Sequence, residues 1–106
     1  MTKGGTRVRA RIRLLATNEG GRNVPVKGGV SYRPNHNFFG SDNREMATGF
    51  IEIPAGEVLR PGETADIELL LWEWSRLTPQ LYAGREWLIQ EGPKVVGMGT
   101  ILEVID

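Results

Sequence analysis

Cysteine is absent from this chain of 106 residues, and histidine occurs only once, as His36. No disulfide can form, and no cluster of histidine and acidic residues has metal-ligand spacing, so we expect no metal site. Ser31, Ser41 and Ser75 have no evident general base, and we expect His36 to be an ordinary side chain of a loop or strand edge. We therefore predict that the protein is not an enzyme and uses no cofactor.

Long apolar segments are missing as well. No run approaches the roughly 20 residues that cross a bilayer as a helix, and residues 1–6 lack the apolar core of a secretory signal. We expect residues 1–6 to be flexible, residues 7–106 to form one domain, and the protein to be cytoplasmic with no membrane partner. A phosphate-binding glycine loop that ends in lysine is also absent, so we expect no nucleotide hydrolysis.

Neither sign of charge is in excess, because 13 basic residues balance 13 acidic ones. No global field would draw the protein to nucleic acid, so an electrostatic partner must bind locally. Arginine dominates the basic residues, with ten arginines and three lysines. Its planar guanidinium suits bidentate contacts with phosphate or carboxylate.

The chain does contain short apolar-polar alternations between glycine and proline turns. Residues 7–16 alternate strictly, and residues 50–53 and 66–74 repeat the pattern, which is typical of half-buried strands. Residues 23–31 are expected to form a loop, and residues 32–39 are a poor strand candidate that contains a proline. Short strands without a convincing helix indicate an all-β barrel or sandwich.

Residues 84–105 form the clearest predicted hairpin, with a turn at Gly92 and Pro93. Gly97 and Gly99 leave one face of the returning strand bare, and we expect this to serve packing. The alternation assigns residues of the last strand to two faces. We expect the core face to carry Val96, Met98, Leu102 and Val104, and the other face to carry Val95, Ile101 and Ile105.

Eight sequence blocks, spread over nearly the whole chain, recur in the order of a known family. They are residues 19–22, 32–34, 48–54, 61–63, 84–85, 89, 91–92 and 96–99. Through these blocks the chain resembles the C-terminal β-barrel domain, the third domain, of elongation factor Tu and its relatives. The resemblance implies a six-stranded antiparallel closed β-barrel that stands alone, without the GTPase domain.

In that family the third domain helps to hold aminoacyl-tRNA. The resemblance implies that RNA, with tRNA as the candidate, is bound in a translation-related role by the residues at the matching positions. These are Arg22, Asn35, Thr48, Glu91 and Gly92. Guanidinium, amide, hydroxyl and backbone N–H groups suit an RNA backbone, although Pro93 removes one N–H donor from the turn.

Four arginines occupy alternate positions of the first strand, at Arg7, Arg9, Arg11 and Arg13. At strand spacing they span roughly 20 Å, so this face could follow an RNA backbone. Four phosphate contacts would give log affinity against log salt a slope on the order of −3 for single-stranded RNA. The alternative is a solvated face that pairs with acidic neighbours such as Glu68 and protects a sheet edge.

A bulky apolar segment follows the strand at residues 66–74. It carries Trp72, Trp74, Leu77, Leu81 and Tyr82, more apolar surface than a turn needs. These side chains either form a protein interface, for a translation factor or a second copy of the chain, or fold back to close one end of the barrel. A protein-interaction module is thus the alternative function.

Overall fold

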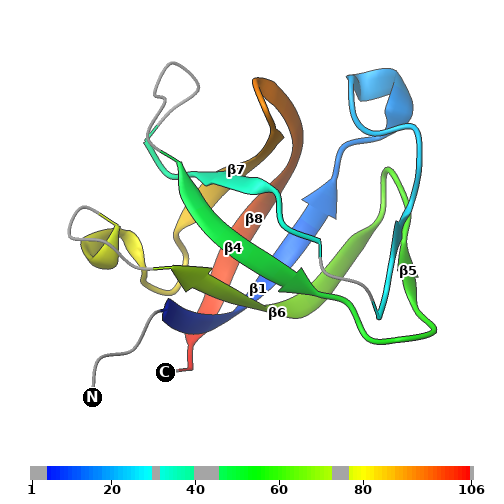
Figure 1. Ribbon diagram of the computed structural model, residues 1–106. Coiled ribbons are helices and arrows are strands. Elements are labelled where there is room, and N and C mark those ends of the chain that lie inside the picture. Colours follow the sequence, from blue (N-terminus) through cyan, green and yellow to red (C-terminus); the bar gives the residue numbers. More distant parts are fainter. Residues whose placement is uncertain (1–4, 30–31, 40–45, 73–76, 106) are drawn as a thin grey trace.

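The computed structural model describes residues 5–29, 32–39, 46–72 and 77–105. Six strands close into an antiparallel barrel, as predicted, and their order is β1-β6-β4-β3-β7-β8. Strands β2 and β5 form a separate two-stranded ribbon (Figure 1). The elements, with η for short 3-10 helices, are β1 (Gly5–Leu14), η1 (Thr17–Glu19), β2 (Val26–Lys27), β3 (Asn35–Asn37), β4 (Ala47–Glu52), β5 (Val58–Leu59), β6 (Thr64–Trp72), η2 (Thr78–Gln80), β7 (Glu86–Glu91) and β8 (Lys94–Val104).

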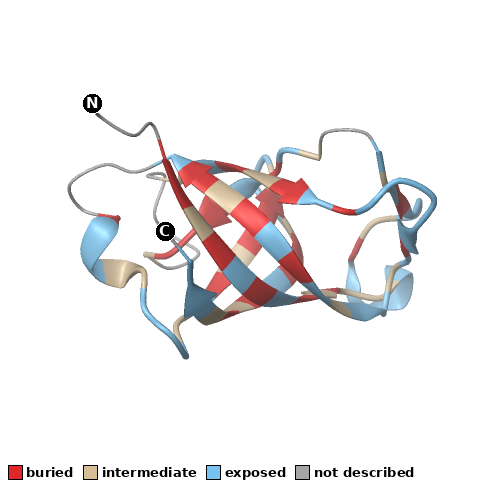
Figure 2. Cartoon of the chain, turned by 90° about the horizontal axis from the view of Figure 1, so that it is seen from below, coloured by how far each residue is buried: buried red, intermediate tan, exposed pale blue. Residues whose placement is uncertain are grey.

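The barrel interior is built from the alternation that the sequence displays. Val8, Ala10 and Ile12 of β1 have no exposed surface, whereas the residues between them face outward. Figure 2 shows the same checkered burial on neighbouring strands. Each strand contributes one apolar face to a common core, which is the burial that stabilises the fold.

Several boundaries differ from the sequence-based expectation. β1 begins at Gly5, inside the segment expected to be flexible. The predicted loop at residues 23–31 contains β2, and residues 32–39 contain β3 directly after Pro34. A proline before a strand removes no hydrogen bond from the ladder, so it does not prevent the strand from forming.

Strand β8 carries two irregularities that change which side chains face the core. Its pairing with β7 passes over Val96, and its pairing with β1 passes over Leu102. Each extra residue reverses the alternation that follows it. The prediction that Met98 faces the core is therefore wrong, because Met98 is 43% exposed, whereas Ile101 is 1% exposed and belongs to the core. The second irregularity restores the predicted phase, so Val104 is the register partner of the buried Val8, but at the end of the strand it is 41% exposed and does not belong to the core.

The hairpin that β8 forms with β7 is confirmed, with Gly92 at φ +60° in its turn. The packing role of Gly99 is also confirmed. A Cβ at this position would lie 2.5 Å from the indole of Trp87, its register partner on β7. The bare face of β8 therefore makes room for a tryptophan inside the barrel.

Candidate binding surfaces

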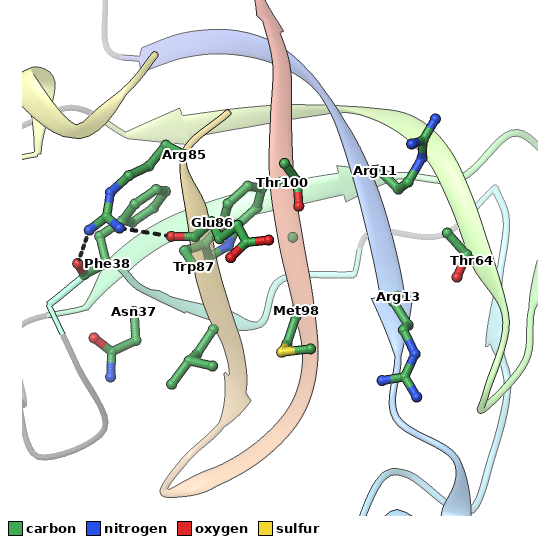
Figure 3. Close-up of a pocket in the computed structure, with 12 residues that line it drawn as sticks. Arg11, Arg13, Asn37, Phe38, Thr64, Arg85, Glu86, Trp87, Met98 and Thr100 are labelled. Atoms are coloured by element: carbon green, nitrogen blue, oxygen red, sulfur yellow. Dashed lines mark hydrogen bonds between the residues drawn. The ribbon is translucent and has the colours of Figure 1, made fainter. Parts of the chain in front are cut away.

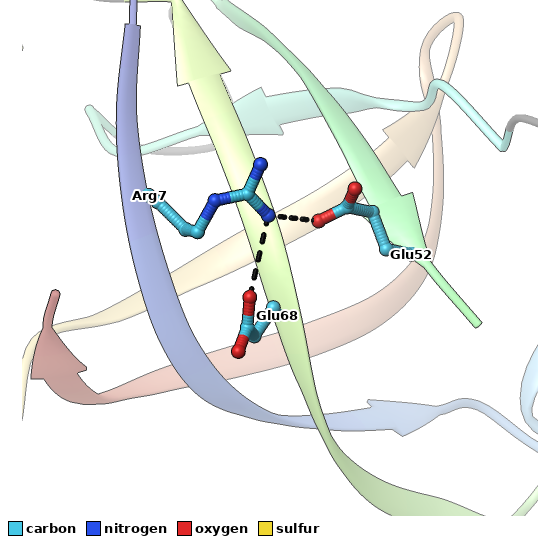
Figure 4. Close-up of polar contacts among 3 residues, drawn as sticks. All are labelled: Arg7, Glu52 and Glu68. Atoms are coloured by element: carbon cyan, nitrogen blue, oxygen red, sulfur yellow. Dashed lines mark hydrogen bonds and ion pairs between the residues drawn. The ribbon is translucent and has the colours of Figure 1, made fainter. Parts of the chain in front are cut away.

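Four arginines project outward from β1, and each lies against a carboxylate. Arg7 donates from Nη1 to Glu52 on β4 and, at 3.3 Å, to Glu68 on β6 (Figure 4). The hydrogen bond with Glu52 raises the pKa of Arg7. Arg7 thus bridges carboxylates of two strands and is not an unpaired cation.

The other three arginines of β1 follow the same pattern. Arg9 lies 3.3 Å from Glu103, Arg11 donates to both oxygens of Asp66 at 2.8 and 3.1 Å, and Arg13 donates to Glu19 at 2.9 and 3.0 Å. The expectation that this face pairs with acidic neighbours, Glu68 among them, is confirmed. The expectation of edge protection is wrong, because β1 pairs with β6 and β8 and has no free edge.

Arg22 lies at the end of the barrel where the β7–β8 hairpin turns, against Glu91, the last residue of β7. Its Nη1 donates to Glu91, whose carboxylate also accepts from the Tyr32 hydroxyl at 2.7 Å. Its Nε donates to the Val24 carbonyl at 3.0 Å, and its guanidinium lies 5.1 Å from the centre of the Tyr32 ring. Burial, and then the hydrogen bond with Glu91, raises the pKa of Tyr32. The ion pair between Arg22 and Glu91 therefore joins the segment that follows η1 to the end of β7.

The remaining residues implied by the resemblance lie at this same end. Asn35 and Thr48 are exposed register partners on β3 and β4. Asn35 is also the register partner of Gln90, whose Nε2 donates to the Gly92 carbonyl at 3.2 Å. A hollow of about 410 Å³ is lined by Asn35, Met46 and the Gly92 turn. We call Asn35, Thr48 and Gly92 the hairpin-end surface.

The arginine face and the hairpin-end surface are separate surfaces. In the order of six strands, β1 is three places from β3 in either direction, so these two strands lie on opposite sides of the barrel. The sequence predicted RNA contacts on both. One RNA strand in contact with both surfaces would have to wrap around the barrel.

The residues predicted for a protein interface divide into two groups. Leu77 has no exposed surface and Leu81 packs against the core, so both help to close the barrel. Trp72 and Tyr82 are 40% and 53% exposed and remain accessible. Trp74 lies outside the described residues.

A groove of about 560 Å³ crosses the outer face of β7, β8 and β1 (Figure 3). Two rows of register partners line it. One row is Asn37, Leu88, Met98, Arg13 and Thr64, and the other is Glu86, Thr100 and Arg11. We call this the β7–β8 groove. The alternation of the sequence did not predict this groove, because the irregularity at Val96 turns Met98 outward and depends on how β8 pairs with β7.

A buried polar pair inside the barrel was also missed. The Nδ1 atom of His36 accepts from Trp87 Nε1 at 3.0 Å, and its Nε2 atom lies 3.2 Å from the Gly49 carbonyl oxygen. Because Nδ1 accepts, the proton is on Nε2, which donates to Gly49. Burial lowers the pKa of His36 to about 4, so the ring is neutral at neutral pH. The expectation of a loop or edge histidine is wrong, since His36 faces the core from β3.

Searches for a metal-binding cluster, a membrane-spanning helix and a matching protein family found none in the parts of the chain that they covered. In the described part of the chain, no group of three or more histidine, cysteine or acidic residues could hold a metal ion. None of the helices in the described ranges has the length and apolar character to cross a membrane. No protein-family model matches the chain. Since one barrel fold can carry unrelated functions, the resemblance to the elongation factor Tu domain stays a prediction.

Proposed function

We propose that the protein is a non-catalytic β-barrel that binds RNA, with tRNA as the candidate, through the hairpin-end surface in a translation-related role. The observation that carries this proposal is that residues from separate segments lie together at one end of the barrel. Arg22, Asn35, Thr48, Glu91 and Gly92 come from separate segments of the chain, and they meet at one end of the barrel. A fold that gathers these groups offers an RNA backbone several polar contacts at once.

In this proposal the residues at the hairpin end have two roles, positioning and RNA contact. Arg22 and Glu91 neutralise each other and hold the segment after η1 against β7. Asn35, Thr48 and the Gly92 turn are exposed, so the amide, the hydroxyl and the backbone N–H groups of the turn are accessible to phosphate or 2′-hydroxyl oxygens. In this proposal Arg22 is therefore a positioning residue.

Two exposed cations flank the hairpin-end surface. Lys94 follows the turn, and Arg33 lies 5.9 Å from the centre of the Phe50 ring. Within the described residues neither cation has an ion-pair partner. Two phosphate contacts would give log affinity against log salt a slope between about −1 and −2.

The proposal is tested by the binding of fluorescently labelled tRNA over a salt series. Asn35→Asp combined with Thr48→Glu should weaken binding at least about tenfold, because two carboxylates then face the phosphates. The double variant Ala55→Asp and Ala83→Glu is the matched control, since both alanines are exposed and neither lines the hollow at the hairpin end. Equal losses in the two double variants, or affinity weaker than millimolar in the parent, would overturn the proposal.

A protein-interaction module is the second candidate. The observation that favours it is the 40% exposure of Trp72, whose ring packs edge-on against Phe50 with centroids 6.3 Å apart. Exposed tryptophan is enriched at the centres of protein interfaces. Light scattering tests self-association directly: a concentration-dependent mass that Trp72→Gln reduces supports this candidate, whereas a strictly monomeric mass counts against a second copy as the partner.

A further inference from the structure

Cations outnumber carboxylates among the side chains that line the β7–β8 groove. Arg11, Arg13 and Arg85 line it, while Glu86 is the one carboxylate among its lining residues. Arg11 and Arg13 have carboxylate partners, Asp66 and Glu19, but these ion pairs are exposed. Exposed ion pairs are weak, so a ligand anion can share or replace the carboxylate at little cost. The groove is thus suited to an anionic ligand.

Arg85 is the cation best prepared for such a ligand. Its Nε donates to Gln80 at 3.2 Å. Its Nη1 donates to the Glu86 carbonyl at 3.0 Å and its Nη2 to the Phe38 carbonyl (Figure 3). All three acceptors are neutral, and no carboxylate of the described residues forms an ion pair with Arg85. Three oxygens thus fix the guanidinium in place without compensating its charge, and two of its five N–H groups remain to donate.

The floor of the groove is apolar and lacks an exposed ring face. Met98 is 43% exposed and Leu88 is half-buried beside it. The two aromatic residues in the lining, Phe38 and Trp87, stack on each other with centroids 5.1 Å apart and are only 4% and 3% exposed. Proteins that bind single-stranded RNA commonly combine cationic contacts with exposed rings on which the bases stack. An apolar side chain of a peptide fits this floor better, because methionine adapts its shape to such partners.

The closed barrel also restricts how a peptide can bind. Both β7 and β8 are paired on each side, so neither offers a free edge to which a peptide could add as a strand. Recognition must therefore come from side chains. We propose that the β7–β8 groove binds an acidic peptide segment that carries an apolar side chain, with Arg85, Arg11 and Arg13 contacting its carboxylates and Met98 contacting the apolar group.

This site is separate from the proposed RNA surface. Binding at each site can be followed by the methyl resonance of one methionine. Met98 lines the β7–β8 groove, whereas Met46 lines the hollow at the hairpin end. The full chain labelled with carbon-13 at its methionine methyl groups is titrated with a glutamate-rich octapeptide that has one central leucine. The Met98 methyl resonance should shift and the Met46 resonance should not. With tRNA the pattern should be reversed.

Matched arginine variants test the charge contribution. Arg11→Gln combined with Arg13→Gln should weaken the octapeptide at least about tenfold. Arg7→Gln combined with Arg9→Gln removes the same charge from the same strand face outside the groove and should change the affinity less than about twofold. The second control is an octapeptide with lysine in place of glutamate, which should not bind.

Four results would overturn the proposal: no octapeptide binding at millimolar concentration, equal losses in the two double variants, equal binding of the lysine octapeptide, or a shift of Met46 in place of Met98. A Met98 shift with a uridine decanucleotide that binds more tightly than the octapeptide would also overturn it, in favour of RNA in the groove. Because the hairpin-end proposal is tested by Met46 and by Asn35→Asp with Thr48→Glu, either proposal can fail while the other stands.

Discussion

Inside the barrel, His36 shares hydrogen bonds with Trp87 and the Gly49 carbonyl, and none of these groups carries a charge. Outside, the four arginines of β1 satisfy their donors with carboxylates. Both regions are polar, and in both each of these side chains has at least one hydrogen-bond partner. They differ in their exposure to solvent. His36 and Trp87 are 0% and 3% exposed, whereas the side chains of Arg9 and Glu103 are 46% and 58% exposed.

That difference decides how much each region contributes to stability. Loss of a partner inside the barrel leaves a donor or acceptor that water cannot reach, which costs the full desolvation of the group. When one partner on the arginine face is lost, water hydrates the remaining charged group and replaces most of the lost interaction free energy. Substitutions should therefore have large effects around His36 and small effects at the outward-facing arginines of β1, although these arginines show the more obvious pattern in the sequence.

The largest effect is expected from Trp87→Ala. The substitution removes a buried ring that stacks on Phe38, opens a cavity beside Gly99 and leaves His36 Nδ1 without its donor. We expect the free energy of unfolding, measured by urea denaturation, to fall by about 3–5 kcal/mol. Trp72→Ala is the matched control and should cost much less, because Trp72 is 40% exposed. Similar losses from the two tryptophans would contradict the contrast between interior and surface.

Acid should produce the next largest effect, through His36. In the unfolded chain the histidine pKa is about 6.5, and in the folded protein burial lowers the pKa of His36 to about 4. Between these values the unfolded state binds the additional proton, so stability falls as the pH is lowered from about 6.5 to 4. The loss should reach on the order of 3 kcal/mol.

Urea denaturation between pH 7 and pH 4 measures this loss. His36→Gln retains an acceptor and a donor but does not titrate, so it should flatten the pH dependence over this interval. Since His36 is the only histidine of the chain, no other histidine contributes to the slope. An equally steep slope in His36→Gln would show that carboxylates dominate the acid response.

The alternating strands of the barrel could be predicted because each repeats one local pattern. The residues of β1 alternate without interruption, and β7 and β8 are joined by a turn for which Gly92 is well suited. Those patterns depend on residues within one strand, so the sequence displays them directly. For β1 and β6 the buried face followed from the same alternation, whereas the irregularities of β8 changed its face at Met98 and Ile101.

The sites were less predictable because they depend on pairing between strands. His36 stands in a three-residue strand, too short to show an alternation, and its partner Trp87 is 51 residues away. The β7–β8 groove exists because β8 has an extra residue at Val96, which turns Met98 outward. Gly97 follows Val96 directly, but a glycine within a strand does not by itself fix the position of an irregularity, which appears only when the register of both strands is known. The carboxylate partners of the arginines likewise lie mostly on other strands.

The smallest effect is expected from Arg9→Gln on the arginine face. Arg9 makes one contact with Glu103, at 3.3 Å, and both side chains are largely exposed. A double-mutant cycle with Glu103→Gln should give a coupling free energy of about 0.2–1 kcal/mol at low salt. In 1 M salt the coupling should nearly vanish, because the screening length is then about 3 Å. A coupling that persists undiminished in high salt would mean that this pair is shielded from water, and the contrast between a costly interior and a tolerant arginine face would no longer hold for β1.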